Sequence, residues 1–320
     1  GSGGGATLNG SGSSLQAAFE QAAAEQIKSS AGITVNYGGG GSGKGRTDLA
    51  SQVVDFAGSD SPIKDEEKST FKGGDVLYFP ILVEPVTVAY NLDGVKDLKL
   101  DAPTIAKIFQ RQITKWNDPA IAAQNSGATL PDQDIVVARR SDSSGTTDNF
   151  SKFLDKAATG VWTLGTGSTI TFPADTQGGN GNSGVAQIVQ QTKGAVGYVD
   201  LSDAVAGNLA VAQVKNQAGS YIAPSVESGS AAAAAAEVKP DLTFSPIWSS
   251  AADGYPITAQ SYVLVYKNQT DKAKGEAIKK YLAYLLGDGQ ALLPDLSYGK
   301  LPQAIADKAK AQIDQIVLPA

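Results

Sequence analysis

Three loops rich in glycine and serine constrain the fold of this chain more than any other sequence feature. They cover residues 10–15, 38–45 and 141–147. Each loop follows a short apolar or β-branched segment and precedes a segment of helical composition. Repeated strand–loop–helix units are typical of α/β domains with a mostly parallel sheet. We therefore predict an α/β fold.

The same alternation continues along the chain. We expect strands at residues 6–8, 33–37, 53–58, 135–140, 195–199 and 261–266, and helices at residues 15–29, 46–51, 102–110, 146–156, 183–191, 272–286 and 303–316. Ser13 or Ser14 is a suitable N-cap for the first helix. The extended segment 76–88 contains Pro80 and Pro85, which favours an edge strand or an irregular crossover. We expect the first hinge there.

The length of 320 residues exceeds the size at which a single hydrophobic core usually stops growing, so we expect two lobes. Lobe I is predicted to comprise residues 6–88 plus 256–320, and lobe II residues 89–255. Residues 1–5 are mostly glycine and are expected to form a flexible tether. Such a tether would suit a chain that has lost a signal peptide, with or without a lipid anchor.

Composition excludes several classes of function. The net charge is −6 and no basic stripe is present, so we expect no nucleic-acid partner. The chain has no Cys and no His, which excludes thiol nucleophiles, imidazole bases and the usual zinc sites. No stretch of about 18 apolar residues occurs that could cross a membrane. We expect no cofactor, no metal and no catalytic activity.

The three loops favour binding of an anion. Helix N-termini leave backbone N–H groups without partners inside the helix and carry a partial positive charge. Glycine allows close approach of the backbone, and serine and threonine hydroxyls add donors. One such loop is usually a plain helix cap. Three of them, distributed over both predicted lobes, favour an anion-binding site.

The third loop carries the strongest signal. Arg140 ends a predicted strand, where a guanidinium group suits a tetrahedral oxyanion. Asp142 is placed to hold that group as its ion-pair partner. Ser144, Gly145 and Thr146 then supply amides and two hydroxyls at the first turn of the following helix. A solvated surface pair is the alternative for Arg139 and Arg140, and the Ser-Gly-Thr turn behind them argues against it.

Asp60 points to the kind of anion. It follows an apolar strand, at the position where ligands bind in open α/β sheets. A carboxylate repels an anion unless that anion carries a proton, as phosphate does and sulfate does not. Asp60 would therefore accept the phosphate proton and reject sulfate. The turn composition of residues 59–62 also fits a plain Asx turn.

On these residues the chain closely resembles the PstS-type periplasmic phosphate-binding proteins. The matching stretches run from Gly10 to Leu15, Asn36 to Gly43, Val54 to Pro62, Ile113 to Asp118, Arg139 to Thr146, Gly194 to Val199 and Tyr255 to Thr258. The likeness extends in order from about residue 6 to the C-terminus. It implies a two-lobed type II periplasmic-binding-protein fold that closes by hinge motion.

The resemblance also implies roles for single residues. Phosphate would be bound by Ser14, Leu15, Ser42, Asp60, Arg140, Ser144, Gly145 and Thr146, with Asp142 supporting Arg140. Family members often have Thr-Phe where this chain has Ser14-Leu15, which retains the hydroxyl and the amide. The implied partners are the membrane permease subunits of an ABC phosphate importer. The implied location is periplasmic or extracellular, and the protein is expected to be monomeric.

Three alternatives differ in class. A receptor for sulfate, molybdate or tungstate would not need Asp60, because those anions carry no proton. A phosphoryl-transfer enzyme would need a metal cluster, an activated nucleophile or a P-loop, and here Lys44 is followed by Gly45 rather than by Ser or Thr. A surface protein that keeps the fold without the ligand is the third.

Overall fold

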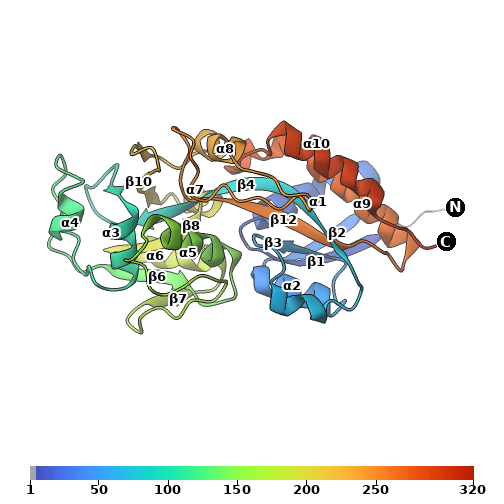
Figure 1. Ribbon diagram of the computed structural model, residues 1–320, viewed down its shortest axis with the longest axis horizontal. Coiled ribbons are helices and arrows are strands. Elements are labelled where there is room, and N and C mark those ends of the chain that lie inside the picture. The colour runs from blue at the N-terminus through green and yellow to red at the C-terminus, as the bar shows by residue number, and fades with distance from the viewer. Residues whose placement is uncertain (1–4) are drawn as a thin grey trace. The chain divides into compact units, whose positions relative to one another are not determined.

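The computed structural model describes residues 5–320. The predicted tether at residues 1–5 lies outside this range except for Gly5. Helices and strands alternate along the chain, as Figure 1 shows, and the predicted α/β class is confirmed.

The chain forms two compact units. Unit 1 comprises the chain up to Val83, Glu237–Ser245 and Gln260–Ala320. Unit 2 comprises Glu84–Ala236 and Pro246–Ala259. These bounds differ from the predicted lobes mainly at residues 237–245, which belong to unit 1 although the sequence gives no signal of a return there.

Unit 1 is built on a sheet in the order β2-β1-β3-β12. β1 (Thr7–Gly12) pairs in parallel with β2 (Thr34–Gly38) and β3 (Phe56–Ser59), and β12 (Thr258–Tyr266) is antiparallel to β3. The connections pass through α1 (Ala17–Ala31) and α2 (Ser42–Ala50). Because β2 and β3 flank β1 on opposite sides, right-handed crossovers place α1 and α2 on opposite faces of the sheet (Figure 1).

The remaining elements of unit 1 follow β3 or β12 in the chain. They are the 3-10 helices at Asp65–Thr70, Asp288–Leu292, Pro294–Leu296 and Ile313–Gln315, and the helices α9 (Lys272–Leu286) and α10 (Gln303–Gln312). Aromatic rings join the sheet to α9. Phe56 stacks on Tyr37 with centroids 6.0 Å apart and meets Tyr281 at 5.8 Å. This core fixes the strand ends from which the functional loops leave.

Unit 2 contains a second sheet. β8 (Ala195–Asp200) pairs antiparallel with β4 (Val76–Tyr90) and parallel with β6 (Val136–Arg140), and β7 (Gln177–Gly179) follows on the other side of β6. β9 (Ala210–Val211) also pairs with β4. The small strands β5 (Lys99–Leu100), β10 (Gln213–Lys215) and β11 (Tyr221–Ile222) form a separate sheet.

The helices of unit 2 are α3 (Ala102–Phe109), α4 (Pro119–Ala122), α5 (Gly145–Ala157), α6 (Gly181–Gln191), α7 (Leu201–Ala206) and α8 (Val226–Ala234). An aromatic cluster holds α5 against the sheet. Phe150 of α5 stacks on Tyr198 of β8 at 4.5 Å and meets Phe109 of α3 edge-on at 4.9 Å. These contacts fix the start of α5, which carries part of the candidate site.

Several predicted details are wrong. β1 continues to Gly12, and α2 begins at Ser42 rather than at Arg46. The N-cap position of α1 is Gln16 and has no side-chain cap bond, so neither Ser13 nor Ser14 is the N-cap, and the Ser13 hydroxyl donates to Asp60. For the segment predicted at residues 76–88, the edge-strand alternative is wrong, since the strand order places β4 between β12 and β8.

A buried carboxyl group in α1 makes the stability of unit 1 depend on pH. Glu20 is 0% exposed, and burial raises its pKa from 4.5 to about 7, although a hydrogen bond from the Tyr281 hydroxyl acts in the opposite direction. The folded protein therefore binds a proton that the unfolded chain has released. The resulting stabilisation is complete below pH 4.5 and is lost as the pH rises through 7.

We therefore expect the free energy of unfolding to fall by about 3 kcal/mol between pH 4.5 and pH 9 because of this group. Glu20→Gln should be flatter over the same range, since glutamine keeps an acceptor for Tyr281 and does not titrate. Urea unfolding at a series of pH values measures both slopes. Equal slopes in the two proteins would show that Glu20 does not titrate in this range.

Candidate functional site

The first candidate loop joins β1 to α1 and is held close to β3. Gly12 has φ +136°, a conformation that favours glycine, and a Cβ there would lie 2.0 Å from the Gly58 carbonyl oxygen. The Ser13 amide donates to that same oxygen at 2.8 Å. The Tyr298 hydroxyl donates to the Leu15 carbonyl at 2.6 Å. Ser14 and Leu15 therefore lie on a backbone that is fixed on both sides.

The second loop ends at the N-terminus of α2. Gly41 precedes that helix with φ +102°, and its amide donates to the Gly12 carbonyl at 2.7 Å. This bond ties the second loop to the first. Ser42 is the first residue of α2 and is fully buried, and its hydroxyl accepts the Asp60 amide at 3.1 Å. The structure thus brings Ser42 and Asp60 into direct contact.

Asp60 joins the candidate site residues of unit 1 through hydrogen bonds. It is 1% exposed, and its Oδ1 accepts hydroxyl bonds from Ser13 at 2.5 Å and Ser261 at 2.6 Å. Oδ2 accepts a longer bond from Ser42 at 3.4 Å. The Gln260 side-chain amide donates to the Asp60 carbonyl at 2.6 Å. A plain Asx turn does not account for a buried carboxylate with these distant partners.

Sequence reasoning missed three of the residues around Asp60. Ser13 was interpreted as a helix cap, and Gln260 and Ser261 lie 200 residues further along the chain. The sequence signal that could have indicated them is the polar pair Gln260-Ser261, which directly precedes an apolar strand segment. Those two side chains reach Asp60 because β12 pairs with β3, and no local pattern predicts that pairing.

In unit 2, Arg140 is held by Asp142 in a two-pronged ion pair. Nε donates to Oδ1 at 2.7 Å and Nη2 to Oδ2 at 2.6 Å, with Arg140 5% exposed. Burial opposes ionisation of Asp142, but the hydrogen bonds and charge of Arg140 outweigh it and lower the pKa of Asp142. The interpretation of Arg140 as a solvated surface residue is therefore wrong.

The N-terminus of α5 carries the other unit 2 residues. Ser144 is the N-cap, and its Oγ accepts the Thr147 amide at 3.0 Å. Its own amide donates to the Ser168 carbonyl at 2.9 Å, so Ser144 has only its hydroxyl to offer, contrary to the sequence-based expectation of an amide. Thr146 Oγ1 accepts from Arg140 Nη1 at 3.4 Å and from Asn182 Nδ2 at 3.0 Å. The Thr146 hydroxyl proton is therefore directed away from Arg140 and Asn182.

The two sets of residues differ in hydrogen-bonding character. The unit 2 set offers a guanidinium group, hydroxyls and the start of a 13-residue helix, which all favour an anion. The unit 1 set includes a buried carboxylate among hydroxyls. A fully ionised anion is disfavoured beside that carboxylate, whereas an anion that retains a proton is able to donate to it.

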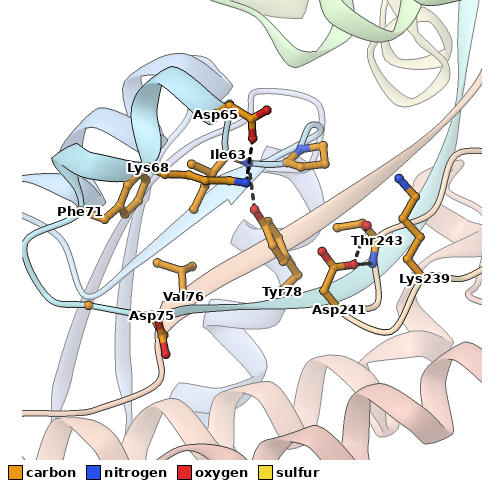
Figure 2. A pocket seen from close by; sticks show the side chains of 12 residues that line it. Ile63, Asp65, Lys68, Phe71, Asp75, Val76, Tyr78, Lys239, Asp241 and Thr243 are labelled. Atoms are coloured by element: carbon orange, nitrogen blue, oxygen red, sulfur yellow. Dashed lines mark hydrogen bonds and ion pairs between the residues drawn. The ribbon is translucent and has the colours of Figure 1, made fainter.

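A pocket of about 520 Å³ lies elsewhere in unit 1 and contains none of the predicted site residues. Figure 2 shows its wall, with Asp65 paired to Lys68, the Tyr78 hydroxyl bonded to the Ile63 amide, and Asp241 accepting from Thr243. Its lining carries three aspartates and two lysines. This mixed, mainly acidic lining does not favour an inorganic anion.

Among residues 5–320, no three carboxylate side chains are grouped closely enough to hold a metal ion. Every helix in the same range is too short or too polar to span a bilayer.

Close packing at the second loop gives a test of its rigidity. A Cβ at Gly45 of α2 would lie 2.6 Å from Gly12 Cα and 2.6 Å from the Ser11 carbonyl oxygen. We expect Gly45→Ala to lower the free energy of unfolding by about 1–3 kcal/mol through this overpacking. Gly38→Ala is the control, because nothing lies within 4 Å of a Cβ there, and its effect should stay within about 0.5 kcal/mol. Thermal unfolding of both variants measures the difference, and equal stability would contradict the packing argument.

The fold corresponds to a known class. The model of the PBP superfamily domain matches residues 1–288, and the chain belongs to that superfamily. A solved high-affinity periplasmic phosphate-binding protein with bound phosphate shares the fold, with a TM-score of 0.79, 24% identity and coverage of 96% of this chain and 93% of that one. A phosphate-binding protein from Stenotrophomonas maltophilia gives a TM-score of 0.77 at 22% identity, covering 96% and 93%. The predicted periplasmic-binding-protein fold is confirmed.

Sequence relatives define the family within this class. The chain is 35% identical to the phosphate-binding protein PstS of Pasteurella multocida, over 96% of this chain and 89% of that protein. It is 36% identical to the phosphate-binding protein PstS 2 of Mycobacterium tuberculosis, over 98% and 88%. The chain belongs to the PstS family, and the resemblance stated from its motifs is confirmed.

Proposed function

We propose that this chain binds inorganic phosphate and delivers it to an ABC-type importer. The observation that carries the proposal is the buried Asp60 carboxylate, which lies among hydroxyl donors in a family whose relatives are named phosphate-binding proteins. Sulfate, molybdate and tungstate carry no proton to donate to this group and are not favoured.

We propose that both sets of site residues contact one phosphate ion. Its oxygens accept from the Ser14, Ser42, Ser144 and Thr146 hydroxyls, from the Ser14, Leu15, Gly145 and Thr146 amides and from Arg140, and its proton is donated to Asp60. For this the Ser42 hydroxyl proton turns to the ligand from Asp60 Oδ2, its acceptor in the structure. Asp142 supports this by fixing the guanidinium plane. Binding by hydroxyls and amides suits a chain with a net charge of −6, because a local set of donors has to overcome the overall repulsion of an anion.

The chain is proposed to bind without catalysis. Hydrolysis of a phosphate ester needs a nucleophile with a base or a metal, and the chain contains no His or Cys to supply them. The hydroxyl of Ser13 donates to the Asp60 carboxylate, which also accepts the hydroxyls of Ser42 and Ser261, an arrangement that holds an acceptor in place. Incubation with p-nitrophenyl phosphate and magnesium tests this, and sustained release of nitrophenol would contradict it.

The partners and the setting follow from the family. We propose that the protein is a monomer that acts outside the cytoplasmic membrane, in the periplasm or at the cell surface, with or without a lipid anchor. The two compact units are proposed to be lobes that close around phosphate by hinge motion. The closed form then docks on the permease subunits of the importer.

Equilibrium dialysis with labelled phosphate tests the binding function. The protein should retain phosphate in the presence of about a hundredfold excess of sulfate, molybdate or tungstate. A difference of about 3 kcal/mol between the binding free energies of the two anions is enough for this result. Displacement of phosphate by sulfate at equal concentration would indicate a general oxyanion receptor instead. No retention of any of the four anions would indicate a surface protein that keeps the fold without the ligand.

A further inference from the structure

Two short hydrogen bonds hold one oxygen of the Asp60 carboxylate. Oδ1 accepts the hydroxyls of Ser13 and Ser261 at 2.5 and 2.6 Å, both shorter than the 3.4 Å bond from Ser42 to Oδ2. A carboxylate oxygen has about two lone-pair sites. The two short bonds therefore use the acceptor capacity of Oδ1 and fix the orientation of the carboxylate.

A glutamine fixes the direction of one of these hydroxyls. Gln16 Nε2 donates to Ser261 Oγ at 2.7 Å and to the Tyr262 carbonyl at 3.0 Å. Since Ser261 Oγ accepts from Gln16, its own proton is directed to Asp60. Gln16 and Ser261 are both 0% exposed, so water does not compete for these bonds.

The other hydroxyl is fixed through its backbone. The Ser13 amide donates to the Gly58 carbonyl at 2.8 Å, and the Ser13 carbonyl accepts the Tyr37 hydroxyl at 2.7 Å. Ser13 is 0% exposed as well. Asp60 is therefore oriented by two side chains that come from different parts of the sheet, the β1–α1 connection and β12.

We propose that Ser13, Ser261 and Gln16 are positioning residues that set the preference for protonated over fully ionised oxyanions. They hold the carboxylate in one orientation through the two short bonds to Oδ1. Without them the carboxyl group is able to turn about its Cβ–Cγ bond or to take up a proton, and in either case it opposes sulfate less strongly. The proposal rests on the proposed function, because it concerns the selectivity of the same site.

The test measures selectivity in a set of variants. Labelled phosphate and competing sulfate give the dissociation constants of both anions for the unmodified protein and for Ser13→Ala, Ser261→Ala, the double variant and Gln16→Met. We expect the sulfate-to-phosphate ratio of dissociation constants to fall about tenfold in each serine variant and by more than about tenfold in the double variant, where the two hydroxyls share the acceptor Oδ1 and do not act independently. Gln16→Met should reduce the ratio by about threefold, since it frees the Ser261 hydroxyl to rotate and also removes the bond to the Tyr262 carbonyl.

Gln16→Met removes the two buried bonds that Nε2 donates, to Ser261 Oγ and to the Tyr262 carbonyl, together with Oε1. Its effect on the fold is therefore read from its melting temperature, separately from its selectivity. Tyr266→Phe is the matched control, because it deletes another β12 hydroxyl, one that donates to the Leu49 carbonyl and does not touch Asp60. Its selectivity ratio should equal that of the unmodified protein, and melting temperatures report the state of the fold.

The outcomes separate this proposal from the function on which it rests. If the unmodified protein does not retain phosphate, the proposed function fails and this inference fails with it. If it binds phosphate selectively but the serine variants weaken both anions by the same factor, the three residues are merely structural and only this inference is overturned. The same conclusion follows if sulfate competes no better in the variants than in the unmodified protein.

Discussion

Arg140→Ala is expected to weaken phosphate binding by about a hundredfold to a thousandfold, the usual range for truncating one partner of a buried charged pair. Arg140 is 5% exposed, and its guanidinium group is oriented by two short bonds to Asp142. Its removal takes away the charge that attracts the anion and leaves the Asp142 carboxylate without its partner. Titration calorimetry with phosphate measures the loss.

Two further variants make this result specific. Arg140→Lys keeps the charge but not the planar fork, so it should recover only part of the affinity. Arg139→Ala is the control, since its neighbouring guanidinium group donates to Thr176 and to the Arg140 carbonyl instead. Arg139→Ala should change phosphate affinity less than about threefold, within the usual range of a substitution outside a site. Equal losses at both positions would contradict the assigned role of Arg140.

Asp60→Asn is expected to reduce the preference for phosphate over sulfate by about a hundredfold or more, in line with sites built around one buried polar contact. Asparagine keeps the shape of the side chain, and its Oδ1 is able to accept the same Ser13 and Ser261 hydroxyls. The amide nitrogen then takes the place of Oδ2 and presents a donor to the ligand. Sulfate is no longer repelled, and phosphate loses the acceptor for its proton.

The measurement is a pair of calorimetric titrations, with phosphate and with sulfate, for both proteins. Sulfate binding should become detectable in the variant while phosphate binding weakens. Unchanged selectivity would mean that Asp60 does not read the ligand proton. Unfolding temperatures serve as the control, since both serine hydroxyls keep an acceptor in Asp60→Asn.

Local sequence patterns predict the elements that carry the site. The β-branched and apolar segments before each loop form β1, β2 and β6, and the helix predicted at 272–286 coincides with α9. The placement of Arg140, Asp142 and Ser144 on a strand–turn–helix unit also follows from local sequence, because strand end, turn and N-cap are all determined within a few residues.

What local sequence does not predict is the pairing of distant segments. Ser261 reaches Asp60 across 201 positions because β12 lies antiparallel to β3, and such a return depends on the packing of a whole lobe. The sequence around Ser13 is typical of a helix cap, but the N-cap position of α1 is Gln16, and the Ser13 hydroxyl donates to the distant Asp60 carboxylate. Residues 237–245 likewise join unit 1 without any local signal.

A crystal structure of the protein grown with phosphate tests the central claim most directly. The claim predicts one phosphate ion whose oxygens lie within about 3 Å of both the Asp60 carboxylate and the Arg140 guanidinium, the distance of a charge-assisted hydrogen bond. Ser14, Ser42, Ser144 and Thr146 should contact the same ion. Phosphate bound away from Asp60, or on Arg140 alone, would contradict it.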